Sequence, residues 1–331
     1  MFPLSISMIQ MFRFLSALCL LLAANLTFAG SYERKDVMFS SQGLKCAAWY
    51  YVPSGLKEGE KRPAIVMAHG FTAVKEMYLD GFAKKFAEAG MVVLVFDYRY
   101  FGASEGEPRA QLFYHEQLQD YRNGISWVSM QKEVDPNRIG IWGASYSGGH
   151  VMHLGAFDRR VKAVVAQVPM TGQWEAYYRS LPAEHLAGTF GWFTQNRADQ
   201  YAKGAVNYIT VAAPEKEPSV VPLKEWYDAF MALSKNAPTW LNRVTIESLE
   251  IGMEYDPTAG IEHISPTPFL MIIASEDIIT PTELEKKAFE RAKEPKKLVV
   301  VPGRHFDAYH GPKHEAFVTP AVDWFTQYLK P

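Results

Sequence analysis

Residues 138–149, RIGIWGASYSGG, place a short apolar run directly before a serine that is surrounded by small residues. The run is typical of a buried strand, and the segment after Ser145 is typical of a helix. Small residues two positions before and after a serine allow the sharp strand-to-helix turn that exposes its hydroxyl. Ser147 stands where a second glycine is usual, and two glycines follow it. The stretch therefore predicts that Ser145 is a nucleophile on a tight turn.

Similar apolar runs alternate with longer amphipathic segments along most of the chain. Strands that are covered by helices on both faces read as nearly continuous apolar runs. Together with two less apolar strands at the start, the runs predict an α/β fold with a mostly parallel, eight-stranded sheet. The expected strands are 35–40, 44–52, 64–68, 91–96, 138–142, 161–168, 269–274 and 297–301. The expected helices are 76–89, 115–131, 146–157, 281–293 and 314–329.

Residues 169–265 interrupt this alternation, because they contain no apolar run of comparable strength and are rich in aromatic residues. A segment of this length is too long for a plain loop in a compact domain. We expect a helical cap here, inserted between two parts of the core, 30–168 and 266–331. Ligands of open α/β sheets bind beyond the carboxyl ends of the strands, so the cap is expected to cover that end. Alternatively, its aromatic residues serve only to pack the cap against the core.

The loops after two later strands offer an acid and a base for the serine. In this type of sheet, the residues follow in the chain order serine, carboxylate, histidine. Asp277 follows the second-to-last expected strand, and its neighbour Glu276 is the alternative acid. His305 follows the last expected strand, and His310, the competing base, lies further from the strand end. We expect Ser145, His305 and Asp277 to act as nucleophile, base and orienting acid.

Acyl transfer also requires donors for the oxyanion. One is the backbone N–H of the residue after the nucleophile, Tyr146, and the other is expected from the loop His69-Gly70-Phe71. The Phe71 N–H is the second expected donor. His69 is accompanied by neither an HExxH pattern nor a cysteine cluster, so no metal site is predicted. The sequence also has no GxGxxG after a strand and no Walker loop, so no cofactor is predicted.

Charge points to no macromolecular partner. The chain has 34 basic and 36 acidic residues, with a net charge of −2. Nucleic-acid-binding proteins usually carry a basic patch, so no nucleic-acid partner is expected. The expected partner is a small acyl substrate, and the aromatic cap favours an apolar one.

The first 29 residues have the order of a secretory signal peptide. Arg13 precedes the apolar run 14–24, and in Thr27-Phe28-Ala29 the first and third residues are small, as signal peptidase requires for a cut after Ala29. The run is shorter than the ~20 residues that a membrane-spanning helix needs. We expect cleavage and a secreted or periplasmic protein with no membrane span in the mature chain; an uncleaved anchor is the alternative. The mature chain would keep one cysteine, Cys46, and therefore no internal disulfide.

With these residues in place, the chain resembles the α/β-hydrolase superfamily nearly from end to end. The stretches 69–76 (HGFTAVKE), 97–104 (DYRYFGAS) and 305–309 (HFDAY) resemble bacterial dienelactone-hydrolase-like proteins and fungal polyketide transferases and thiohydrolases. The resemblance implies a Ser–His–Asp enzyme with a cap after the sixth strand and without a metal or cofactor. Its members act on esters, thioesters, carbon–carbon bonds and peptides.

Four further residues in these stretches have expected roles. Asp97 and Arg99 are expected to hold the loop after the fourth strand rather than to react. Asp307 and Tyr309 are expected to line the loop that carries the base.

The sequence thus predicts a serine hydrolase that cleaves a carboxylic ester, lactone or thioester through an acyl-enzyme on Ser145. An acyltransferase or a carbon–carbon hydrolase would use the same three residues. A prolyl dipeptidyl-type peptidase shares the fold and the Ser-Tyr turn, but requires a site for a free amino terminus. A ligand-binding protein on a hydrolase fold is the alternative from another class, because a fold alone does not establish catalysis.

Overall fold

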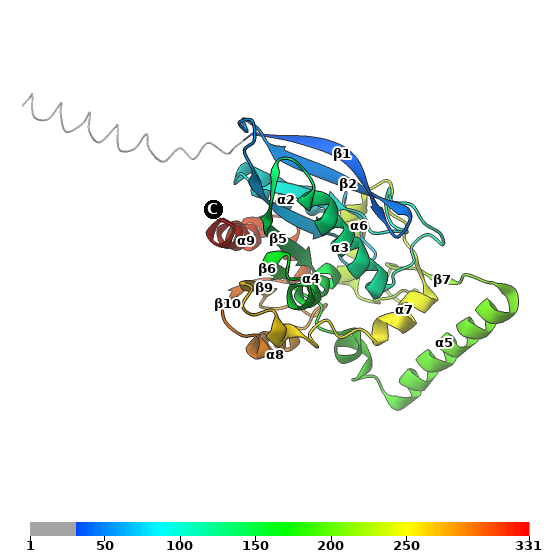
Figure 1. Ribbon diagram of the computed structural model, residues 1–331. Coiled ribbons are helices and arrows are strands. Elements are labelled where there is room, and N and C mark those ends of the chain that lie inside the picture. The colour runs from blue at the N-terminus through cyan, green and yellow to red at the C-terminus, as the bar shows by residue number, and fades with distance from the viewer. Residues whose placement is uncertain (1–30, 331) are drawn as a thin grey trace, which may run out of the picture. The chain divides into compact units, whose positions relative to one another are not determined.

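A computed structural model describes residues 31–330; the expected signal peptide, residues 1–29, lies outside them. The central sheet has eight strands in the order β1-β2-β4-β3-β5-β6-β9-β10 (Figure 1). β2 pairs antiparallel with both β1 and β4, and the other neighbours pair in parallel. The strands are β1 (Tyr32–Ser41), β2 (Leu44–Pro53), β3 (Arg62–Ala68), β4 (Val92–Phe96), β5 (Val134–Ala144), β6 (Val161–Gln167), β9 (Phe269–Ala274) and β10 (Lys296–Val301). The mostly parallel, eight-stranded sheet expected from the sequence is confirmed.

Helices cover both faces of this sheet. Contacts place α2 and α9 together on one face, whereas α3 and α4 lie side by side on the other. Every residue of β4 and β9 is buried as a result, which explains their uninterrupted apolar sequences. The helices are α2 (Leu79–Glu88), α3 (Tyr114–Ser129), α4 (Tyr146–Phe157), α8 (Thr282–Arg291) and α9 (His314–Tyr328).

The first helix begins later than its sequence pattern suggests. It was expected from residue 76, but α2 starts at Leu79, and Tyr78 stands at its N-cap with φ −155°. The Tyr78 hydroxyl accepts a hydrogen bond of 2.7 Å from the amide of Gly70. The residues before α2 are thus used to fix the preceding loop, an interaction across the turn that helical periodicity does not reveal.

The segment between β6 and β9 contains three helices and a small second sheet. The helices are α5 (Ala183–Lys203), α6 (Lys224–Ser234) and α7 (Ile246–Met253). Two-residue strands, β7 (Tyr208–Ile209) and β8 (Val244–Thr245), pair antiparallel. This pair was not expected, because two residues carry no readable periodicity. α5 lies away from the central sheet and contacts α7 (Figure 1).

Cys46 in β2 is fully buried, and this burial raises the pKa of its thiol. Among residues 31–330, no helix has both the length and the apolar character that crossing a membrane would need.

Candidate active site

Ser145 lies between the end of β5 and the start of α4, in a strained backbone conformation. Its φ is 56° and its ψ is −120°, a region that residues with a side chain seldom occupy. The turn is held because the Ser145 amide donates to the Gln167 carbonyl at 3.0 Å and its carbonyl accepts from the Met170 amide at 2.9 Å. A Cβ at Gly143 would collide with the Ser147 carbonyl. The small residues around Ser145 are therefore required by backbone crowding.

The Ser147 side chain explains the departure from the usual glycine. Its hydroxyl is fully buried and lies 2.9 Å from the Tyr121 hydroxyl. Tyr121 also donates to the carbonyl of Trp142 at 2.8 Å and accepts from the amide of Ala68 at 3.0 Å. The hydroxyl thus joins a network that ties β3, β5 and α3 together beneath the turn.

The structure brings Asp277 and His305 together in a buried hydrogen bond. Nδ1 of His305 donates to Oδ2 of Asp277 at 2.7 Å. Oδ1 of Asp277 accepts from the amides of Ile279 and Thr280 at 2.8 and 2.9 Å, so the carboxylate is held in one orientation. Glu276, the alternative acid, has its side chain exposed.

Two residues behind this pair escaped the sequence analysis. The Thr280 hydroxyl donates to Oδ2 of Asp277 at 2.9 Å. Glu285 on α8 is fully buried, and Thr280 lies 3.4 Å from one of its oxygens. Burial, and then the charge of Asp277, raise the pKa of Glu285 well above its ordinary value. A threonine three residues after the acid is the only sequence signal that could have indicated this second layer.

Nε2 of His305 is the atom expected to take the proton of Ser145. In the part of the chain that the structure describes, its hydrogen-bond partner is the hydroxyl of Tyr309, 3.1 Å away, and not Ser145. Burial raises the pKa of Tyr309 well above its usual value, and the neighbouring Ser145 hydroxyl opposes this rise. Tyr309 therefore stays protonated, and its hydroxyl lies next to both His305 and Ser145. The competing base, His310, is exposed.

The two expected oxyanion donors lie beside Ser145. Tyr146 is the first residue of α4, where backbone N–H groups have no partner within the helix and the helix dipole is positive. Phe71 lies on the loop that Tyr78 fixes, and Trp240 donates to the carbonyl of the next residue, Thr72, at 3.0 Å. The aromatic rings of Phe71 and Tyr146 are 5.7 Å apart. The loop is thus fixed from both the core and the segment between β6 and β9.

Asp97 is buried beside the loop 69–72, which carries the expected oxyanion donor Phe71 and is called the oxyanion loop below. It accepts hydrogen bonds from the amide and the ammonium group of Lys75, at 2.7 and 2.6 Å, and from the amide of Ala103 at 3.1 Å. Arg99 donates to Asp120 at 2.6 Å. Burial lowers the pKa of His69 to about 4, so this histidine is neutral at pH 7.

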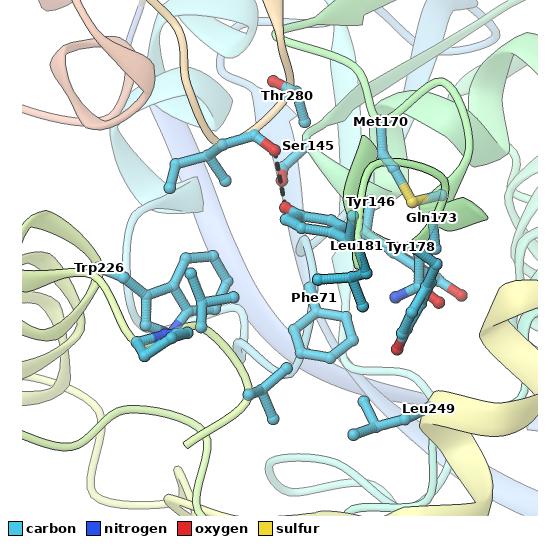
Figure 2. Close-up of a pocket in the computed structure, with 15 residues that line it drawn as sticks. Phe71, Ser145, Tyr146, Met170, Gln173, Tyr178, Leu181, Trp226, Leu249 and Thr280 are labelled. Atoms are coloured by element: carbon cyan, nitrogen blue, oxygen red, sulfur yellow. Dashed lines mark hydrogen bonds between the residues drawn. The ribbon is translucent and has the colours of Figure 1, made fainter. Parts of the chain in front are cut away.

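A cavity of about 240 Å³ begins at Ser145 and is enclosed mainly by apolar side chains (Figure 2). Loops of the core form one side, and α6, α7 and the π-helical turn Trp174–Tyr178 contribute the other. Residues labelled there are Phe71, Ser145, Tyr146, Met170, Gln173, Tyr178, Leu181, Trp226, Leu249 and Thr280. We refer to it as the acyl cavity. Residues 31–330 contain no group of three or more His, Cys, Asp or Glu side chains placed to hold a metal ion.

Comparisons with known proteins place the chain in a family of hydrolases. Residues 42–307 match the family model of the X-Pro dipeptidyl-peptidase (S15 family). The quorum-quenching protein AidA of Acinetobacter baumannii is 30% identical, over 89% of this chain and 95% of that protein. The thiohydrolase aneE of Aspergillus aculeatus is 29% identical, over 75% of this chain and 79% of its own. The crystal structure of the α/β hydrolase GrgF from Penicillium sp. matches with a TM-score of 0.78 and 26% identity, covering 90% of this chain and 99% of that one.

Proposed function

Because the chain belongs to the X-Pro dipeptidyl-peptidase (S15) family and has an α/β-hydrolase fold, we propose that it is a serine hydrolase with Ser145 as its nucleophile. The observation that carries this proposal is the strained turn at Ser145 next to the buried His305–Asp277 pair. Residues held in rare backbone conformations cluster at functional sites, where the surrounding structure maintains the strain. The substrate is a carboxylic ester, lactone or thioester.

The reaction proceeds through an acyl-enzyme. His305 takes the proton of Ser145 as the serine oxygen attacks the carbonyl carbon. Asp277 holds the imidazole in the tautomer that leaves Nε2 free to accept, and stabilises the imidazolium that forms. His305 then protonates the departing oxygen or sulfur, and later activates the water that releases the acid.

The amides of Phe71 and Tyr146 stabilise the oxyanion. The positions of these amides support this role. Phe71 lies on a loop that is fixed by hydrogen bonds at both Gly70 and Thr72, and Tyr146 lies at the positive end of the α4 dipole. Donors that are held in place before the reaction need no reorganisation as charge develops, and removing one such donor typically costs about 10²–10³ in rate.

The acyl cavity supports an apolar acyl group and weighs against a peptidase. A peptidase that removes X-Pro dipeptides must bind a free ammonium group, for which a carboxylate is the natural partner. None of the fifteen residues that line the cavity, all within the described part of the chain, is an aspartate or a glutamate. Burying an unpaired ammonium group there would be costly.

The proposal is tested with methyl esters of straight-chain acids from two to twelve carbons, following acid release in a pH-stat. We expect turnover by the protein that begins at Gly30, an optimum at a medium acyl length, and none by Ser145→Ala. A fluorophosphonate should label Ser145, and Gly-Pro-nitroanilide should not be cleaved. Folded protein that is neither labelled nor active on any ester would refute the proposal, and efficient dipeptide release would favour the peptidase.

We further propose that residues 1–29 direct export and are removed. This rests on the order of charge, apolar run and small residues in the sequence. The exported protein should begin at Gly30 by N-terminal mass analysis; retention of residues 1–29 would favour the anchor.

A further inference from the structure

A second, much smaller cavity meets the acyl cavity at Ser145. Its volume is about 20 Å³, and Ser145, Phe71 and Trp226 line both cavities. His305 lines only the smaller one, together with Tyr78 and Tyr309. The base therefore faces the small cavity, while the acyl cavity extends from the other side of the nucleophile.

The polar wall of the small cavity is formed by His305 and two tyrosines. Tyr78 and Tyr309 are both buried, and their ring centres lie 4.3 Å apart. The Tyr78 hydroxyl is held by the Gly70 amide at 2.7 Å, and the Tyr309 hydroxyl by Nε2 of His305 at 3.1 Å. The Tyr309 hydroxyl thus lies in this wall within hydrogen-bond distance of Nε2, the atom that exchanges protons with the departing and the attacking oxygen.

The opposite wall is apolar and comes from α6. Phe230 and Leu233 are buried there and line the small cavity, whereas neither lines the acyl cavity. Phe230 is wedged between Trp226 and Trp240, with ring centres 4.5 and 5.7 Å away. Side chains packed in this way do not yield without cost, so α6 sets the width of the space in front of His305.

We propose that this small cavity, named here the leaving-group cavity, selects esters whose leaving group is methanol-sized, and admits water as the acceptor in preference to larger alcohols or amines. The inference rests on the proposed serine chemistry. Its free volume of about 20 Å³ compares with about 240 Å³ in the acyl cavity, so only a small group or a water molecule is expected beside His305.

The same space serves both halves of the reaction, because the departing and the attacking oxygen exchange protons with the same nitrogen. Ser145 Oγ bonds to the acyl carbon as its proton passes to Nε2 of His305. The bond from that carbon to the alcohol oxygen breaks as Nε2 returns the proton to this oxygen. Water then bonds to the acyl carbon and gives a proton to Nε2, which passes to Oγ as the acyl–serine bond breaks. An alcohol that is too large to depart through the leaving-group cavity is therefore also too large to enter it as an acceptor.

The chain offers a matched pair of leucines for the test. Leu233 on α6 lines the leaving-group cavity, and Leu249 on α7 lines the acyl cavity; both are buried. Truncating either to alanine removes the same atoms from the same segment of the fold. Leu233→Val provides a milder enlargement of the leaving-group cavity.

The experiment measures kcat/KM for methyl, ethyl, butyl and benzyl esters of one acid, with wild type, Leu233→Ala, Leu233→Val and Leu249→Ala. We expect wild type to prefer the methyl ester over the butyl ester by at least roughly 100-fold, since each of the three additional methylene groups costs about tenfold or more where it does not fit. Leu233→Ala should raise the butyl-to-methyl ratio by about tenfold and Leu233→Val by less. Leu249→Ala should leave this ratio within about twofold and instead shift the preferred acyl length.

Fluorophosphonate labelling of Ser145 separates the two proposals, because fluoride is a small leaving group. Labelling together with equal turnover of methyl and butyl esters would overturn the size selection and leave the serine chemistry standing. Equal shifts by Leu233→Ala and Leu249→Ala would overturn it as well. Absence of labelling in folded protein would overturn the proposed function and this inference together.

Discussion

The central sheet and the segment between β6 and β9 are built in different ways. All five residues of β4 are buried, whereas only Phe193 and Asn196 are buried among the 21 residues of α5. Burial of apolar surface is the main favourable contribution to folding, so the sheet dominates stability. Other parts of the segment between β6 and β9, α6 and α7 among them, form walls of the two cavities. The expected catalytic residues thus lie on loops of the central sheet, and in our proposal substrate size is set by α6 and α7 of the inserted segment.

The largest effect is expected from the orienting acid in the core. Asp277→Asn keeps the shape of the side chain but favours the wrong tautomer of His305, and should lower kcat by about 10³–10⁴. Glu276→Gln, which alters the exposed neighbour, should change kcat by less than about twofold. Steady-state kinetics on a methyl ester measures both. A larger loss in Glu276→Gln than in Asp277→Asn would reverse the assignment of the acid.

The second largest effect is expected on the free energy of unfolding, which a substitution in the central core should lower much more than one in α5. Phe325 on α9 is fully buried and packs edge-on against Phe86, whereas Phe190 on α5 is half exposed. Phe325→Ala should lower the free energy of unfolding by about 3–5 kcal/mol, because it opens a cavity in the core. Phe190→Ala should change it by about 0.5 kcal/mol or less. Urea denaturation measures both, and equal losses would mean that α5 is buried in solution.

Glu285, buried beside Asp277, should make the free energy of unfolding depend on pH. Its folded-state pKa is raised, so its contribution to stability is full below the unfolded-state pKa and is lost as pH rises toward the folded-state value. Gln does not titrate. The stability advantage of Glu285→Gln over wild type should therefore grow from pH 5 to pH 7, by up to about 1.4 kcal/mol per unit.

Urea denaturation at pH 5, 6 and 7 tests this expectation. Glu283→Gln provides the control, because Glu283 is exposed on the same helix and should give a difference that is nearly constant with pH. A difference for Glu285→Gln that is equally constant would mean that this side chain is charged at pH 7.

The smallest effect concerns the contact that joins the two regions at the oxyanion loop. Trp240→Phe removes the hydrogen bond to the Thr72 carbonyl and keeps most of the packing. A neutral hydrogen bond contributes about 0.5–1.5 kcal/mol, so kcat should fall by roughly threefold to tenfold. Thr239→Val removes a nearby bond to Glu76, which lies outside the oxyanion loop, and should leave kcat unchanged. Comparable losses of kcat in both variants would mean that the general packing of residues 239–240 against the core matters, and not the hydrogen bond to Thr72.

The sequence predicted the core far better than the segment between β6 and β9. β9 and α4 occupy the predicted ranges 269–274 and 146–157, because an apolar run and a helical period are both local signals. The chain order of Ser145, Asp277 and His305 also pointed to residues that the fold brings to one edge of the sheet. Tyr78 and Glu285 could not be found in this way, because their roles arise from contacts across the fold. The pair β7–β8 was missed because strands of two residues carry no readable periodicity.

The burial of Cys46 makes the rate of its chemical modification a measure of how often the edge of the sheet opens. A protein that begins at Gly30 has this single thiol, in β2 opposite Phe39 of β1. A thiol reagent reaches such a group only during the moments when the edge of the sheet opens. The modification rate therefore reports how often β1 and β2 separate from β4, without any added label. Substrate or inhibitor bound in the acyl cavity should slow this modification if it stabilises the sheet against such opening.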